Sequence, residues 1–506
     1  MAPVAQVRGM TEPSTLSTRV RAGILWSALN NLTLRVGTLV TGIALARLLD
    51  PEAFGVFAIA LTVQTALITL SELGLAADLV RHGDIDRRGP TIATLSLASS
   101  GLLTVAVLLA ASTVADFFTT PAAAPVIQVM ALTLVLAGIG VVPYSRLQRQ
   151  LRQKELFQIE LVAFVLSTGL SIGLAVAGTG AMSIAIGRLV AQVAVVALQF
   201  VMTRTRPVLG WDRGIAVTGL RFGLPLSLAG LLSLALLNVD NVVVGRLGGA
   251  TLLGLYVIAF NLSAWPSSIV GTAIRAVAMP AFAQHAQESL DGRRDGTRVL
   301  ARSSALTWGI AVPMSVGLGV LAHPVVTILY GSPWAAAAGA LVWLAPFGAL
   351  RILTDVWVAY LTAHGHSLML LACQATWFAA LVPTMAWAVH HRGLDGAGLA
   401  HVTIASCVVV PVFLLALRAA GVHCTEVLRA LVVPALAALP MVAVGVTAMR
   451  ALDDPWLELF GAGTAMTAVY VAIAGRSMRR LMSDPLPQAP PSLIEPMVVT
   501  QGHHAA

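Results

Sequence analysis

The chain has 506 residues, of which 57% are hydrophobic and 11% are charged, and its formal net charge is +8. A soluble domain carries about 25% charged residues, so the composition excludes a string of soluble domains, and it also excludes a disordered chain, a disulfide scaffold and a fibrous repeat. A polytopic membrane protein remains, in which a basic excess is typical of the cytoplasmic loops.

Fourteen stretches of the chain are apolar and long enough to cross a bilayer core, which takes about 20 residues of helix. The first stretch follows a polar segment, residues 1–22, and is too long for a signal-peptide core, so we expect it to be retained. In chain order the fourteen stretches are approximately 24–48, 54–79, 91–115, 123–143, 157–178, 181–203, 219–245, 251–275, 303–329, 335–362, 367–390, 397–417, 428–449 and 456–475.

The charges of the connecting loops predict the orientation. If the N-terminus is cytoplasmic, the inner segments hold 22 of the Lys and Arg residues, whereas the outer loops hold four. The outer four are Arg47, Arg246, Arg392 and Arg450. This asymmetry follows the positive-inside rule and predicts that both termini are cytoplasmic. The tail over 476–506 is basic, then Pro-rich, and we expect it to be disordered.

One segment of the chain is repeated. Residues 45–61 read LARLLDPEAFGVFAIAL and residues 244–260 read VGRLGGATLLGLYVIAF, so that Arg47 aligns with Arg246 and Gly55 with Gly254. Each copy spans the turn from one predicted helix into the next, and six helices separate the copies, which gives the two halves the same orientation about an axis along the membrane normal. The alternative is a chance alignment of apolar runs.

The repeat predicts an all-α polytopic membrane protein of about fourteen transmembrane helices. Two six-helix lobes, over 23–205 and 206–418, would surround a central cavity, and two additional C-terminal helices would follow over 419–475. Transport sites usually lie between such lobes.

Four further stretches carry a resemblance to a known family. They are ARLLDPEAFGVFAIAL (46–61), FGLPLSLAGLLSLALLNVDNVVVGRLGGATLLGLYVIAFNL (222–262), MPAFAQ (279–284) and LYGSPWAAAAGALVWLAP (329–346). With these segments the chain, over about 15–475, resembles the bacterial polysaccharide transporters and O-antigen (lipid-linked oligosaccharide) flippases, in the superfamily that also holds multidrug exporters and the lipid II flippase.

The resemblance implies a function in the bacterial cytoplasmic membrane. A polyprenyl-(di)phosphate-linked oligosaccharide would be moved across it by alternating access between two lobes, for lipopolysaccharide, exopolysaccharide or another envelope polysaccharide. The implied partners are this lipid-linked substrate, membrane lipids, and a polysaccharide polymerase with glycosyltransferases. Two alternatives stay open within the superfamily, a multidrug or metabolite exporter and a lipid II flippase.

Arginines inside the predicted helices are candidate substrate-binding residues. A charge at the bilayer centre costs about 2.5–3.5 kcal/mol on insertion scales, so it usually faces a cavity or a partner. Arginine stays charged when partly buried, and its fork of donors matches phosphate oxygens. The candidate cavity cations are Arg35, Arg188, Arg275 and Arg351. The alternatives are a structural contact between helices for Arg35 and an interaction with lipid headgroups for Arg275.

Three acidic residues are candidates for ion coupling or charge pairing. Asp355 lies four residues after Arg351 and therefore on the same helix face, where the two would form an ion pair or a pair that opens for substrate. Asp240 lies between two asparagines and would bind a cation or proton, or pair with an arginine. Glu72 has the same alternatives.

Other kinds of chemistry find little support in the sequence. The single lysine, Lys154, does not follow a glycine, which excludes a G-x-x-x-x-G-K-[ST] nucleotide loop. We expect no catalytic residues, no metal site, no cofactor and no nucleic-acid partner. A membrane enzyme or scaffold of polysaccharide assembly is a third alternative, and it would need a catalytic cluster in a loop that the sequence does not show. The glycine pairs Gly169/Gly173 and Gly219/Gly223 have the spacing of close helix contacts.

Overall fold

The computed structural model describes residue 26 and residues 33–71, 73–82, 84–267 and 293–483. Within these ranges every regular element is a helix. Twelve helical stretches there are long and apolar enough to cross a membrane. This confirms the predicted fold class. The count of fourteen stays a prediction, because the stretch 24–48 lies partly outside the described residues and residues 367–419 form one continuous stretch.

Large apolar side chains remain exposed along these helices. Leu102, Leu109 and Leu368 are 71%, 81% and 81% exposed. Contiguous apolar surface of this kind is rare on a soluble monomer. In a bilayer the same side chains lie in hydrocarbon. Their transfer from water into hydrocarbon is favourable by about 0.8 kcal/mol per CH₂ group.

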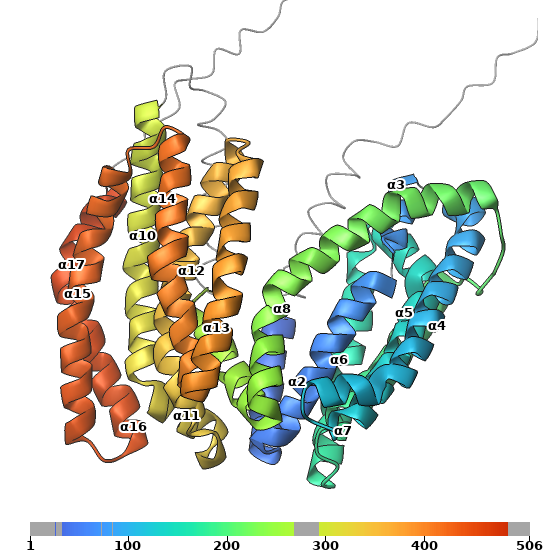
Figure 1. The fold of residues 1–506 in the computed structure, drawn as a ribbon, viewed down its shortest axis with the longest axis horizontal. Coiled ribbons are helices and arrows are strands. Elements are labelled where there is room, and N and C mark those ends of the chain that lie inside the picture. Colours follow the sequence, from blue (N-terminus) through green and yellow to red (C-terminus); the bar gives the residue numbers. More distant parts are fainter. Residues whose placement is uncertain (1–25, 27–32, 72, 83, 268–292, 484–506) are drawn as a thin grey trace, which may run out of the picture. The chain divides into compact units, whose positions relative to one another are not determined.

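The chain divides into two compact units (Figure 1). The first consists of residues 1–261, 322–341 and 381–400. Within it, α4 packs on α5, α6 packs on α7, and α5 also contacts α2 and α7. Its helices are α2 (Pro51–Ser71), α3 (Leu75–His82), α4 (Ile85–Phe117), α5 (Ala123–Arg149), α6 (Gln153–Val176), α7 (Met182–Thr203), most of α8 (Arg213–Ser263) and α11 (Ala322–Tyr330).

The second unit consists of residues 262–321, 342–380 and 401–506. Its helices include α10 (Arg293–Val320), α14 (Val410–Ala419), α15 (Cys424–Ala451), α16 (Pro455–Leu457) and α17 (Gly463–Ser483). Most of α12 (Ala337–Ala363) lies here, and α13 (Ser367–Ile404) contributes residues to both units. The C-terminal helices α15 and α17 both pack on α10. The predicted lobes, 23–205 and 206–418, stay a prediction.

Two stretches that the sequence predicts as single helices are interrupted, and this corrects their boundaries. The stretch 54–79 ends as α2 and restarts as α3, because Leu73 and Gly74 adopt positive φ values of 45° and 61°. A helix cannot continue through such residues. The stretch 303–329 is divided between α10 and α11 at Leu321.

Two other helices contain sharp breaks at glycine. Gly249 within α8 has φ 72° and ψ −172°, and Gly393 within α13 has φ 55° and ψ −130°. Only glycine adopts such angles without steric cost. Each break lies between two stretches that the sequence predicts as separate helices, so each marks the turn of a helical hairpin.

The two G-x-x-x-G spacings differ in their surroundings. Nothing lies within 4 Å of a Cβ placed on Gly169 or Gly173, so this pair makes no close helix contact. A Cβ on Gly223 would lie 1.8 Å from the carbonyl oxygen of Leu73. The second spacing therefore marks a position where α8 approaches the turn before α3 too closely for any side chain.

Candidate transport site

The structure places the predicted arginines on three different helices. Arg35 lies in the helix over residues 33–48 and Arg188 in α7, both with exposed side chains and both in the first unit. Arg351 lies half-buried in α12, in the second unit. Arg275 falls outside the described residues, as does Glu72. The grouping of these residues in one cavity stays a prediction.

Asp240 is held by a tyrosine of the same helical hairpin. Its side chain is 5% exposed, and the hydroxyl of Tyr256 donates a hydrogen bond of 2.8 Å to its Oδ2 atom. Tyr256 is fully buried and packs beside the ring of Phe260. Because the two residues flank the break at Gly249, the bond joins the two arms of the hairpin. Sequence analysis missed this partner, although Tyr256 carries a hydroxyl where the first repeat has Phe57.

The turn of α12 that precedes Arg351 carries one ring of an aromatic cluster. The ring of Phe347, one turn before Arg351, lies 4.7 Å from the buried ring of His401 and 6.3 Å from that of Trp377, between centroids. The pairing of Arg351 with Asp355 stays a prediction.

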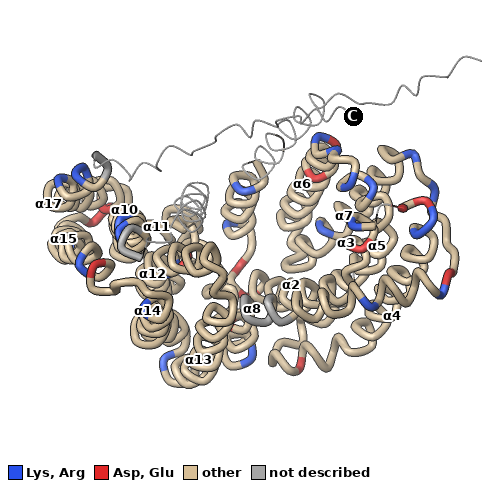
Figure 2. Tube along the Cα trace, turned by 90° about the horizontal axis from the view of Figure 1, so that it is seen from above, with Lys and Arg blue, Asp and Glu red and all other residues tan. Residues whose placement is uncertain are grey.

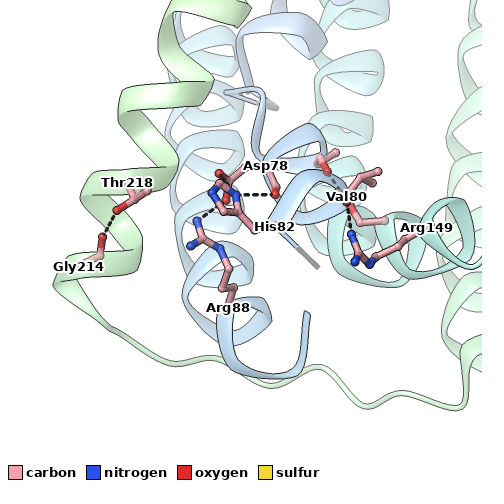
Figure 3. A network of polar contacts seen from close by, with 9 residues as sticks. Asp78, Val80, His82, Arg88, Arg149, Gly214 and Thr218 are labelled. Atoms are coloured by element: carbon pink, nitrogen blue, oxygen red, sulfur yellow. Dashed lines mark hydrogen bonds and ion pairs between the residues drawn. The ribbon is translucent and has the colours of Figure 1, made fainter. Parts of the chain in front are cut away.

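A buried charge network lies where α3 meets α4, and sequence analysis missed it (Figure 3). Asp78 is fully buried, and its Oδ2 atom accepts a hydrogen bond of 2.6 Å from Nη2 of Arg88. Nδ1 of His82 lies 3.1 Å from the other carboxylate oxygen. Nearby, Arg149 of α5 donates to the backbone carbonyl of Val80. The signal in the sequence was the i, i+4 spacing of Asp78 and His82, followed by the basic residues that open α4.

Basic residues gather around this network. Figure 2, coloured by charge, shows several of them near α3, α6 and α7. One is Arg81, whose guanidinium lies 4.9 Å from the centre of the Phe222 ring. Arg152, at the start of α6, pairs with Glu155. Both contacts hold residues at the ends of helices in place.

Comparison with known proteins places the chain in a family. The model of a polysaccharide biosynthesis protein family matches residues 44–339. The succinoglycan biosynthesis transport protein ExoT of Rhizobium meliloti (strain 1021) is 27% identical over 403 residues, which cover 78% of this chain and 79% of that protein. The lipopolysaccharide biosynthesis protein WzxC of Escherichia coli (strain K12) is 25% identical over 340 residues, covering 67% of this chain and 68% of that protein.

Solved structures show the same fold. The lipid II flippase MurJ, in an inward closed conformation, matches with a TM-score of 0.72 and 14% identity, over 91% of this chain and all of that one (100%). An inward-facing multidrug resistance transporter of the MATE family matches with a TM-score of 0.59 and 19% identity, over 79% of this chain and 98% of that one. The family match spans more than half of the chain, and the helices are those of a multi-pass membrane protein. The chain therefore belongs to the polysaccharide biosynthesis protein family, as a multi-pass bacterial membrane protein with the fold of these flippases and exporters.

Proposed function

We propose that this protein is a flippase that moves a polyprenyl-(di)phosphate-linked oligosaccharide across the bacterial cytoplasmic membrane. The observation that carries the proposal is the similarity to the succinoglycan transport protein ExoT, which extends over about four-fifths of both chains. The product would supply an envelope or extracellular polysaccharide. The fold, shared with MurJ, is consistent with alternating access between two lobes.

The chemistry of the cargo explains the need for arginines inside the membrane. A diphosphate cannot enter hydrocarbon unless its charge is offset, and the cost of desolvating it falls when donors are already in place. Arg35, Arg188, Arg275 and Arg351 are the cations proposed to do this.

The orientation is part of the proposal. Both termini would be cytoplasmic, as the distribution of arginines between alternate loops indicates. The polysaccharide polymerase would then act on the outer face and the glycosyltransferases on the inner face. Asp240, buried and bonded to Tyr256, is the candidate for coupling transport to protons or cations.

The test of the cavity arginines is Arg35→Ala in a strain that lacks the chromosomal copy. We expect polymer export to stop while the protein reaches normal abundance in the membrane, and Arg35→Lys to retain part of the activity, because it keeps the charge but not the fork of donors. Arg450→Ala is the matched control, since this exposed arginine lies at the end of α15. Normal export by Arg35→Ala at normal abundance would remove Arg35 from the proposed site.

A further inference from the structure

The two copies of the repeated segment cross each other at equivalent glycines. A Cβ placed on Gly55 would lie 1.7 Å from the carbonyl oxygen of Ala250, and one on Gly254 would lie 2.0 Å from that of Pro51. Gly55 aligns with Gly254, and Pro51 with Ala250, under the shift that aligns Arg47 with Arg246. The contact is thus reciprocal, as an internal two-fold axis requires. This supports the repeat against a chance alignment.

A second contact links the end of the helix over 33–48 to the region around α11. Nε of Arg47 donates a hydrogen bond of 2.9 Å to the carbonyl of Leu329, and its Nη2 donates to the carbonyl of Ile328. Nε1 of Trp334 donates a bond of 2.6 Å to the carbonyl of Ala46. All three acceptors lie in the last turn of a helix, where carbonyls lack intrahelical partners and the helix dipole attracts a cation. Each helix end is therefore capped by a side chain from the other segment.

The other copy of the repeat makes the corresponding contact in a weaker form. The guanidinium of Arg246 lies 5.4 Å from the centre of the Phe117 ring, at the end of α4. A Cβ on Gly245 would lie 3.0 Å from the ring of Phe118. α4 covers the third predicted stretch of the first half, and α11 covers the end of the third predicted stretch of the second half. The Arg47 side therefore has hydrogen bonds to carbonyls, whereas the Arg246 side has contacts with aromatic rings.

We define these contacts as the outer junction, formed by residues 46–55 and 245–254 with 117–118 and 328–334. All of it lies within the first compact unit. Each contact joins a segment of the first half of the chain to a segment of the second half. We propose that the outer junction is the closed exit of the transport path, and that Arg47 and Trp334 are the positioning residues that hold it closed until the cargo is released outside.

The proposal rests on the proposed function for the orientation of the protein in the membrane. With that orientation, which is inferred from the charges of the loops, the outer junction lies at the outer face. The Arg47 side and the Arg246 side of the outer junction should differ in how strongly they hold it closed, because their contacts differ in kind. The bonds of Arg47 and Trp334 must all break when the exit opens, and bonds from a charged donor cost more to lose than ring contacts. Substitutions on the Arg47 side should therefore open the exit more than the substitution Arg246→Ala.

The test measures how easily a reagent reaches the junction from outside. The reporter is Ala250→Cys, because Ala250 is only 7% exposed while the junction is closed. The native cysteines, Cys373, Cys407 and Cys424, are first replaced by serine so that only the reporter is labelled. Cells are treated with a membrane-impermeant maleimide. We expect Arg47→Ala to increase the labelling rate about tenfold, in line with the loss of hydrogen bonds to a charged group. Trp334→Phe should act in the same direction, and Arg47→Lys should give an intermediate rate.

Arg450→Ala, in an exposed position on α15, is the control and should leave the rate unchanged. Unchanged labelling in Arg47→Ala at normal abundance, or an equal rise with Arg450→Ala, would overturn the proposal. Labelling only in inverted vesicles would also overturn it, because the junction would then face the cytoplasm. The experiment is repeated in cells that make no lipid-linked glycan. If Arg47→Ala increases the labelling rate in these cells as well, the outer junction is supported even if the proposed cargo is wrong. The two proposals can therefore fail separately.

Discussion

At the residue scale, two ion pairs near the start of α4 differ in their surroundings. Asp78 is fully buried and its partner Arg88 is 12% exposed, whereas the carboxylate of Asp86, which pairs with Arg146, is 87% exposed. Water screens the second pair, and such pairs contribute about 0–1 kcal/mol. Removing one partner of a buried pair leaves an uncompensated charge in a medium of low dielectric constant.

This difference predicts the effect of two matched substitutions on stability. Asp78→Ala should lower the free energy of unfolding by about 3–5 kcal/mol, whereas Asp86→Ala should change it by less than about 1 kcal/mol. Thermal unfolding of the purified proteins in the same detergent measures both. Equal melting temperatures for the two variants would show that the Asp78 network does not stabilise the fold.

The hydrogen bond between Tyr256 and Asp240 predicts a second effect at this scale. Tyr256→Phe should cost about 1.5–3 kcal/mol, because it removes a bond to a charged group. Asp240→Asn keeps an acceptor for that bond and removes the charge, so its stability should change less. If Asp240 couples transport to ions, Asp240→Asn should nevertheless stop export at normal abundance. Full export by Asp240→Asn would assign the carboxylate a structural role only.

The sequence predicted which of the described charged residues lie inside helices, but it did not predict the partner of Asp240. Asp240 and Tyr256 are 16 positions apart and meet only because the chain reverses at Gly249. No helical periodicity relates such positions. The contacts of Phe347 with Trp377 and His401 were not predicted either, because they join α12 to α13. The pairing of Arg351 with Asp355 stays a prediction.

At the element scale, the glycines decide where helices stop and where they touch. The apolar stretches predicted the helices well, because the length of hydrocarbon to be crossed is encoded directly in the sequence. The break between α2 and α3 was not predicted, since Leu73 and Gly74 interrupt a run that stays apolar on both sides. Because the chain contains 44 glycines, their spacing alone did not indicate which of them lie at close helix contacts.

Two alanine substitutions separate these roles of glycine. Gly223→Ala should strongly destabilise the protein, because its Cβ would overlap the carbonyl oxygen of Leu73. Gly169→Ala should stabilise it by up to about 1 kcal/mol, because Gly169 lies in an open helix interior where alanine has the higher helix propensity. Abundance in the membrane and melting temperature in detergent measure both effects. Loss of stability in Gly169→Ala would show that α6 makes a contact there.

At the scale of the whole molecule, the repeat and the family are what the sequence predicted best. The aligned glycines at 55 and 254 are explained by the reciprocal crossing of the two copies. The family resemblance is confirmed by a match over residues 44–339.

The most direct test of the proposed function is mass spectrometry of the polyprenyl-linked glycans in a deletion strain and its complemented counterpart. We expect a completed lipid-linked oligosaccharide to accumulate in the deletion strain and complementation to return it to the normal level. Accumulation of lipid II in its place would support the alternative cargo of this superfamily. An unchanged pool of lipid-linked glycans, in a strain without a redundant paralogue, would contradict the flippase function and favour a drug or metabolite exporter.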